Sequence, residues 1–274
     1  MKQRMAKQVI SMLPQNAISK AAGALGRSKM SRLAIKPYAK LYDIDLSQIE
    51  KPVHHYKHLT EFFTRKLQAG ARPIANGEKT IVSPVDGTVA QLGFITEGAM
   101  IQAKGIDYSV EALLGDRVAH FQNGSFITIY LSPRDYHRIH MPLAGYITSS
   151  TYIPGRLFPV NEIGVNHVQG LFTKNERLIT YANTTAGEVA IVKVGAFIVG
   201  SVKVGYNEAF KQGGRDVVKT THEATHVEKG QELGLFEFGS TVILLFEEGK
   251  MTLNHTLKPG SIVKMGEAIG TITT

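Results

Sequence analysis

The stretch GLFEFGSTVILLFEEG, residues 234–249, has the composition of a β-strand but is interrupted near its middle. Apolar side chains that favour strands stand at Phe236, Phe238, Val242, Leu244 and Phe246. Between them lie Gly239 and Ser240, although glycine weakens a strand interior because it has no side chain to pack and loses the most backbone entropy on folding. A Gly-Ser pair inside a buried strand therefore calls for a functional reason.

Outward from this stretch, most of the chain after residue 80 consists of short β-rich runs separated by Gly, Pro and Asp. Such runs predict an α+β protein with a mainly antiparallel β-sandwich or barrel-like core. Residues 227–236 and 263–272 place Val, Gly, Gly and a final apolar residue at identical offsets. These units resemble the strand–turn–strand elements of biotinyl and lipoyl carrier domains. No lysine lies at a convincing tip position for attachment of a prosthetic group, so the likeness concerns architecture only.

The N-terminal part of the chain has a different character. Residues 1–42 hold nine basic side chains and no acidic one, whereas the whole chain carries +8, so the remainder is nearly neutral. Short amphipathic helices are predicted at about residues 5–13, 16–25 and 28–35, the first ended by Pro14 and the last by Pro37. From these residues alone, a lipid-bound segment, a solvated tail, a nucleic-acid-binding arm and a targeting peptide all remain open.

A further helix is predicted just before the β-rich region. Leu59, Phe62, Phe63 and Leu67 form an apolar face at helical spacing, and Thr60 is placed to cap its start.

Composition excludes several kinds of site. The chain has no cysteine, which rules out disulfides, cysteine nucleophiles and thiolate metal sites. It has no run of 18 apolar residues that could cross a bilayer as a helix. Few aromatic residues accompany the basic segment, which argues against binding of single-stranded nucleic acid.

Three motifs compete as carriers of chemistry. HEATH, residues 222–226, matches the zinc-protease pattern H-E-x-x-H, but that chemistry needs a helix, and the surrounding threonines and glycine disfavour one. SPRDYHRIHMP, residues 132–142, places His137 and His140 in a polar turn after an apolar strand, where an imidazole can act as a general base. SPVDGTV, residues 83–89, contains Asp86 before a glycine, which by itself is an ordinary turn.

Asp86, one of the two histidines and Ser240 are the components of an acid–base–nucleophile triad, although the sequence does not show that they meet.

A family resemblance supplies that link. FGST at residues 238–241 resembles the LGST-type self-cleavage motif of the phosphatidylserine decarboxylases, with Phe238 in place of the usual leucine. Further blocks similar to that family follow one another in the expected order: HLTEFFTRKLQAGARPI (58–74), SPVDGTV (83–89), QAKGIDYSVEALLG (102–115), YLSPRDYHRIHMPLAG (130–145), GRLFPVN (155–161) and LFTKNERL (171–178). Several long blocks at consistent spacing are far more specific than a tetrapeptide.

The resemblance implies a division of roles. Asp86, His140 and Ser240 match the triad for autocatalytic cleavage, and Gly239–Ser240 matches the scissile bond. Cleavage yields a β chain, residues 1–239, and an α chain, residues 240–274, whose first residue becomes a covalent pyruvoyl group. The implied reaction is a Schiff base with phosphatidylserine, loss of CO2 and release of phosphatidylethanolamine, with His137 handling the substrate and no metal.

The resemblance also decides among the readings of the basic segment. Residues 1–48 are interpreted as a membrane-associating helical segment that binds anionic lipid, and residues 49–274 as the catalytic domain; nucleic acid is not expected. A peripheral location on the cytoplasmic side of the cell membrane, associated α and β chains and a homodimer are implied. Two alternatives remain: a pyruvoyl decarboxylase of a soluble amino acid and a non-catalytic lipid-binding β-sandwich.

Overall fold

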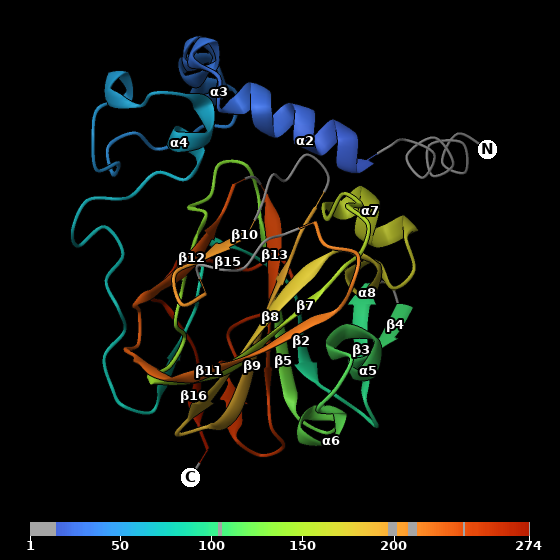
Figure 1. Cartoon of the computed structure of the whole chain (residues 1–274). Helices are drawn as coiled ribbons and strands as arrows, with labels where there is room; N and C mark the ends of the chain where they lie inside the picture. Colours follow the sequence, from blue (N-terminus) through green and yellow to red (C-terminus); the bar gives the residue numbers. More distant parts are fainter. Residues whose placement is uncertain (1–14, 104–105, 197–201, 208–212, 238, 274) are drawn as a thin grey trace.

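The structure is a computed structural model that describes residues 15–103, 106–196, 202–207, 213–237 and 239–273. In this part of the chain, the largest element is an eight-stranded antiparallel sheet with the order β11-β7-β8-β9-β13-β5-β2-β15 (Figure 1). In that order, the strands span Val218–Val227, Gly145–Ile153, Arg177–Thr184, Gly187–Val194, Ser240–Phe246, Ser125–Leu131, Gly87–Phe94 and Ile262–Val263. The predicted α+β class with a mainly antiparallel core is confirmed, and the likeness to carrier domains stays a prediction.

Strand β13 lies in the interior of this sheet and is the quoted stretch from Ser240 onward. It pairs with β5 on one side, with Ser240 opposite Leu131, and with β9 on the other, with Thr241 opposite Val194. All seven of its residues are buried. Its side chains alternate between two cores, because successive residues of a strand point to opposite faces. Because both faces of β13 are buried, its residues 242–246 are all apolar, whereas a strand with one exposed face would alternate between apolar and polar residues.

Smaller sheets cover one face of the large sheet. They have the orders β1-β16-β14 and β10-β12-β6, and their residues join Val242, Leu244 and Phe246 in one apolar core. Their strands are β1 (Thr80–Val82), β16 (Ala268–Ile272), β14 (Met251–Leu253), β10 (Val202–Val204), β12 (Glu232–Phe236) and β6 (Arg138–His140).

The other face of the large sheet is covered by the hairpin β3-β4 and by short helices, which enclose Ile243 and Leu245 in a second core. These elements are β3 (Ala99–Ala103), β4 (Ile106–Ser109), α5 (Val110–Leu114), α6 (Val118–Phe121), α7 (Glu162–His167) and α8 (Leu171–Lys174).

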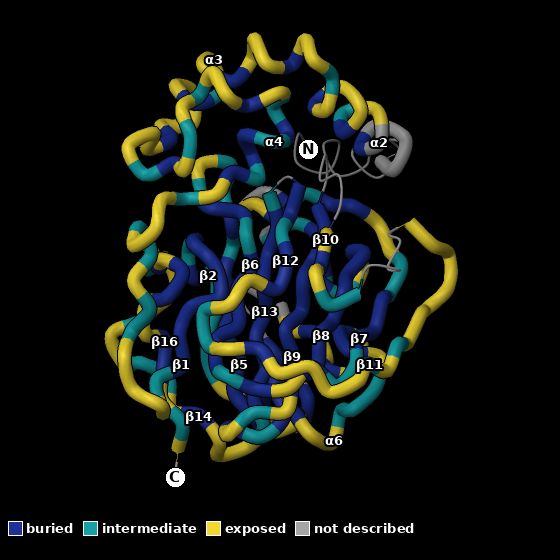
Figure 2. Tube along the Cα trace, turned by 60° about the vertical axis from the view of Figure 1, so that its left-hand side comes forward, coloured by how far each residue is buried: buried dark blue, intermediate teal, exposed yellow. Residues whose placement is uncertain are grey.

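A helical cap, residues 15–63, lies over one end of the sheets, far from the C-terminus (Figures 1 and 2). It contains α2 (Gln15–Gly26), η1 (Lys29–Ala34), α3 (Ile35–Leu41), η2 (Val53–His55) and α4 (Leu59–Phe63). A third core lies within the cap and contains buried residues from both sides of the predicted boundary at residue 48: Ile35, Ala39, Ile44, Ile49, Tyr56 and Phe62. The division into domains 1–48 and 49–274 stays a prediction.

Two helix predictions were wrong in detail. Pro37 does not end a helix but lies in the first turn of α3, where its missing N–H would have had no intrahelical partner. Helix α4 is capped by the side chain of His58, not by Thr60, and Leu67 lies outside it in a β-bridge with Ile49. The predicted helix at residues 5–13 lies outside the described residues, whereas α2 corresponds to the one predicted at 16–25. Among the described helices, none has the length and hydropathy needed to span a bilayer.

The two similar segments, residues 227–236 and 263–272, form turns with the same contact. Gly230 and Gly266 have φ values of +81° and +90°, a region that favours glycine. A Cβ at Gly230 would lie 2.7 Å from Cδ1 of Ile74, and a Cβ at Gly266 would lie 3.0 Å from the same atom. Both turns therefore pack against this one side chain.

Replacement of Gly266 tests this close packing. A Cβ at Gly266 would lie 2.5 Å from the carbonyl oxygen of Pro73, whereas Gly260 has a similar φ of +92° and open space around it. We expect Gly260→Ala to lower the free energy of unfolding by about 1 kcal/mol through backbone strain alone, and Gly266→Ala to lower it by about 3 kcal/mol. Urea unfolding in a Ser240→Ala background measures both. Equal losses would contradict the packing argument.

Candidate functional site

Ser240 is the first residue of β13 and is fully buried. By strand alternation its side chain points to the same core as Val242, toward the sheet that contains β6 and β12. Its Oγ has no hydrogen-bond partner among the described residues. A buried hydroxyl without a partner is unfavourable by about 1–3 kcal/mol, so such an atom in a native structure calls for a functional explanation.

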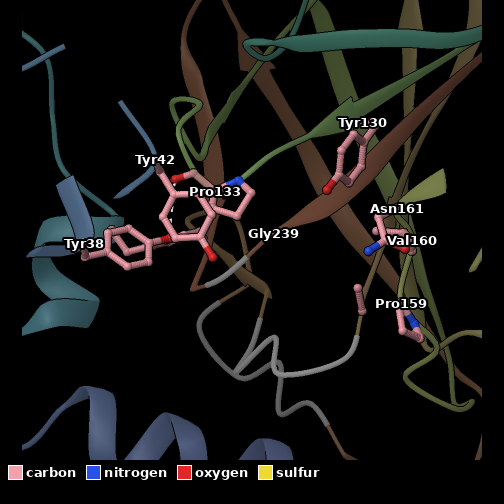
Figure 3. A pocket seen from close by; sticks show the side chains of 10 residues that line it. Tyr38, Tyr42, Tyr130, Pro133, Pro159, Val160, Asn161 and Gly239 are labelled. Carbon is pink, nitrogen blue, oxygen red and sulfur yellow. Dashed lines mark hydrogen bonds between the residues drawn. The ribbon is translucent and has the colours of Figure 1, made fainter. Parts of the chain in front are cut away.

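Gly239 lines a pocket of about 280 Å³ next to this serine. Aromatic residues of the cap, Tyr38, Tyr42 and Phe63, form part of its wall. The remaining lining comes from the body of the protein: Tyr130, Pro133, Pro159, Val160, Asn161 and Ala196 (Figure 3). The carbonyl oxygen of Leu131 would lie 3.3 Å from a Cβ at position 239, so the close approach of β5 favours glycine here. Phe238 lies outside the described residues.

His137 is buried behind one wall of this pocket. Its ring lies 4.0 Å from the ring of Phe63, centroid to centroid. Its Nδ1 is 2.8 Å from the carbonyl oxygen of Asp135 and therefore carries the proton and donates it. Nε2 keeps its lone pair and has no hydrogen-bond partner in the described part of the chain. Burial lowers the pKa of His137 to about 3, which keeps the imidazole neutral.

His140 lies three residues after His137, at the end of β6, and has both ring nitrogens occupied. Nδ1 donates to the carbonyl oxygen of Gly230 at 2.8 Å, and Nε2 accepts from the hydroxyl of Tyr136 at 3.2 Å. Burial lowers its pKa, whereas the Gly230 carbonyl and the charges of Glu232 and Asp86 oppose that shift. His140 is therefore a second neutral imidazole, held in one orientation by two partners.

Asp86 is also buried, and its carboxylate is fully engaged. Arg72 donates to it through Nε at 2.8 Å and through Nη2 at 2.5 Å, and the N–H of Met265 donates at 2.8 Å. A planar guanidinium matches a carboxylate well, so this pair holds Asp86 in place while it balances its charge. Asp86, Arg72 and Tyr136 line a second pocket of about 290 Å³.

The predicted site residues thus fall into two groups. Gly239 lines the first pocket, Ser240 follows it in the chain, and His137 packs against Phe63 of the pocket wall. Asp86 and His140 lie beside Arg72 and Tyr136. The backbone holds Asp86 and His140 near each other, because the N–H of His140 donates to the carbonyl of Pro84 at 2.8 Å. Within the described residues, no hydrogen bond joins Asp86 to His140 or His140 to Ser240. The direct triad stays a prediction.

Sequence reasoning missed Arg72 and Met265 as partners of Asp86 and did not assign a role to Tyr136. Arg72 and Tyr136 lie in the blocks at residues 58–74 and 130–145, so family likeness was the available signal for them. Met265 contributes only its backbone N–H, for which the sequence carries no signal.

The HEATH segment lies on strand β11 rather than on a helix. His222 faces Ser150, with Nε2 and Oγ 2.9 Å apart, whereas the His226 ring packs against Tyr146. No group of three histidine or acidic side chains in the described ranges is arranged to hold a metal ion. The zinc-protease geometry is therefore not formed by this motif.

The burial of His137 predicts a pH dependence of stability. Its pKa falls from 6.5 to about 3 on folding, so the unfolded chain binds one more proton between these values, and stability decreases as the pH falls through this window. Between pH 7 and pH 5, we expect a loss of about 2 kcal/mol from this residue. Urea unfolding of Ser240→Ala, with and without His137→Gln, measures it, and an undiminished loss in the double variant would contradict this origin.

Comparison with known proteins shows the family to which the chain belongs. The family described as phosphatidylserine decarboxylase matches residues 59–271. The chain is 53% identical to a phosphatidylserine decarboxylase proenzyme of Brevibacillus brevis, over 96% of each chain. It is 46% identical to a protein of the same name from Myxococcus xanthus, over 97% of this chain and 98% of that one, and 42% identical to one from Yersinia enterocolitica, over 94% and 93%. The chain therefore belongs to the phosphatidylserine decarboxylase family.

Proposed function

We propose that the protein decarboxylates phosphatidylserine to phosphatidylethanolamine and CO2 after it has cut its own chain between Gly239 and Ser240. The observation that carries this proposal is the Ser240 hydroxyl, which is buried without a partner among the described residues, directly after a glycine that lines a pocket. Family membership supports it, because the relatives are named as proenzymes of this activity.

Cleavage begins with attack of Ser240 Oγ on the carbonyl carbon of Gly239. The peptide bond becomes an ester by an N-to-O acyl shift, and elimination then releases residues 1–239. Water hydrolyses the dehydroalanine left at position 240, which loses ammonia and becomes the pyruvoyl group. We assign the proton transfer to His140, with Asp86 favouring its protonated form through space. Because burial keeps His140 neutral, Nε2 can take up a proton once the Tyr136 hydroxyl turns away from it.

Position 240 fits the pyruvoyl group that this chemistry leaves there. The unpaired Oγ faces a core at the end of a strand, next to a pocket with open space, and the buried Oγ1 of Thr241 also lacks a partner among the described residues. The pyruvoyl group supplies a ketone that condenses with the substrate amine and accepts electrons as CO2 leaves. His137 has a free lone pair at Nε2, and its ring packs against Phe63 in the wall of the pocket. We assign to Nε2 the removal of a proton from the ammonium group of the substrate and the return of this proton to the substrate carbon.

The cap supports a lipid substrate. Large apolar side chains are exposed on it at Leu25, Met30, Leu33, Leu41 and Leu46. Exposed basic residues lie among them at Lys29, Arg32, Lys36 and Lys40. An apolar face with a basic rim is typical of a segment that lies in a membrane interface, where each basic residue adds about 1 kcal/mol of attraction to anionic lipid. Tyr38 and Tyr42 of the same cap line the pocket, so a head group can reach it while the acyl chains stay in the bilayer.

We propose a peripheral location at the cytoplasmic face of the cell membrane, with no nucleic-acid partner. The two chains remain associated, because residues 240–274 contribute β13 to the interior of the large sheet. A homodimer remains part of the proposal on the basis of family resemblance alone.

Intact mass under denaturing conditions tests the cleavage. We expect two chains that part after Gly239, the smaller one lighter than a serine-started peptide by the difference between serine and pyruvoyl. Ser240→Ala removes the attacking oxygen and should give one chain of 30.0 kDa less one oxygen atom. A single uncut chain from the unaltered protein would contradict the proposal and favour a non-catalytic lipid-binding protein.

Substitutions of His137 and His140 should have different effects on cleavage and on decarboxylation. We expect His140→Ala to abolish cleavage, and His137→Ala to leave cleavage intact while it lowers decarboxylation of phosphatidylserine vesicles by about 100-fold or more, as loss of a general acid does. His222→Ala on β11 is the matched control and should change neither readout. Loss of cleavage in His137→Ala but not in His140→Ala would reverse the assignment.

A further inference from the structure

Three charged side chains meet beside the proposed cleavage point, where the cap touches the body. Glu237 accepts from Arg27 Nη1 at 2.9 Å and from Lys203 Nζ at 2.7 Å. Its side chain is only 5% exposed, whereas those of Arg27 and Lys203 are 47% and 63% exposed. Arg27 follows α2 of the cap and Lys203 lies in β10, so a buried carboxylate joins two separate parts of the fold.

The charges in this cluster do not balance. Two cations share one carboxylate, and within the described ranges neither Arg27 nor Lys203 has another ion pair. Among the described side chains, this cluster therefore has an excess of one positive charge. Such an excess next to a pocket attracts an anion.

Cleavage supplies an anion at this place. Elimination breaks the Cβ–Oγ bond of residue 240, the α-proton of that residue goes to a base, and the ester oxygen leaves as part of a carboxylate on Gly239. Gly239 follows Glu237 by two residues, a reach of at most about 7 Å. Strand β12 ends at Phe236 and is paired with β6 and β10. Only three residues separate this fixed strand end from the new terminus, so the carboxylate stays near the cluster.

The alternative position for this carboxylate is unfavourable. Gly239 lines a pocket whose other walls are largely aromatic and aliphatic. A carboxylate left there without a partner loses much of its solvation, and it repels an anionic substrate that enters the same pocket.

We propose that Arg27 and Lys203 form a carboxylate-binding site that receives the Gly239 terminus after cleavage. This inference rests on the proposed function. The site neutralises the new charge, draws it away from the pocket and ties the end of the larger chain to the cap. Before cleavage the peptide bond itself holds residue 239, so the same cations then serve Glu237 alone.

Hydrogen exchange of residues 237–239 tests this with four proteins. Arg27→Gln with Lys203→Gln is made in the native chain, which cuts itself, and in Ser240→Ala, which does not. We expect the double substitution to speed exchange in both proteins, because Glu237 loses its partners in each, but about tenfold more in the cut protein, where the new terminus loses its partners as well. Lys29→Gln with Lys36→Gln removes the same charge from the cap elsewhere and should leave exchange unchanged.

Two results would overturn the inference: equal acceleration in both backgrounds, or none in the cut protein. As a measurement that needs no further variant, about 1 M sodium chloride should speed exchange at these residues in the cut native protein more than in Ser240→Ala. If the native chain is not cut, the proposed function fails together with the inference. If it is cut and the terminus exchanges independently of the cations, only the inference fails.

Discussion

The rest of the structure depends on the pairing of β13 with β5 and β9. This strand is hydrogen-bonded on both sides and packed on both faces, so it joins the two cores of the molecule. A cut immediately before Ser240 removes one covalent bond but none of these contacts, because Ser240 is already paired with Leu131. A strand that is paired on both sides and buried on both faces can therefore also be the place where the proposed chain break occurs.

Burial determines the state of the two histidines. Both imidazoles have a lowered pKa because burial disfavours the charged form, and each has its proton fixed on Nδ1 by a backbone carbonyl. They differ at Nε2, which has no partner among the described residues in His137 and is covered by Tyr136 in His140. The segment of residues 132–142 thus provides two neutral imidazoles that differ in whether Nε2 is free to accept a proton. This difference is the physical reason for assigning them to two different steps.

The sequence was most informative where a property is local. Continuous apolar character predicted the β-rich core, and the interruption of an apolar run by Gly239 and Ser240 was enough to mark the candidate site. It failed where a property depends on contacts between distant segments. Pro37 is tolerated because of where α3 begins, and Asp86 is paired with Arg72 and Met265 because three separate stretches converge on it. No periodicity or composition rule reports such convergence, and family likeness marked Asp86 and Arg72 without giving their partners.

The internal similarity between residues 227–236 and 263–272 has a structural role, because both segments supply backbone partners to the site residues. Each segment turns at a glycine with positive φ against the same side chain, Ile74. The first turn offers the carbonyl of Gly230 to His140, and the second offers the N–H of Met265 to Asp86. Equivalent turns thus supply one acceptor and one donor to the two titratable residues. Because these partners are backbone atoms held by packed turns, they cost little reorganisation when a proton moves, and the positions of Asp86 and His140 are set by the fold rather than by a direct bond between them.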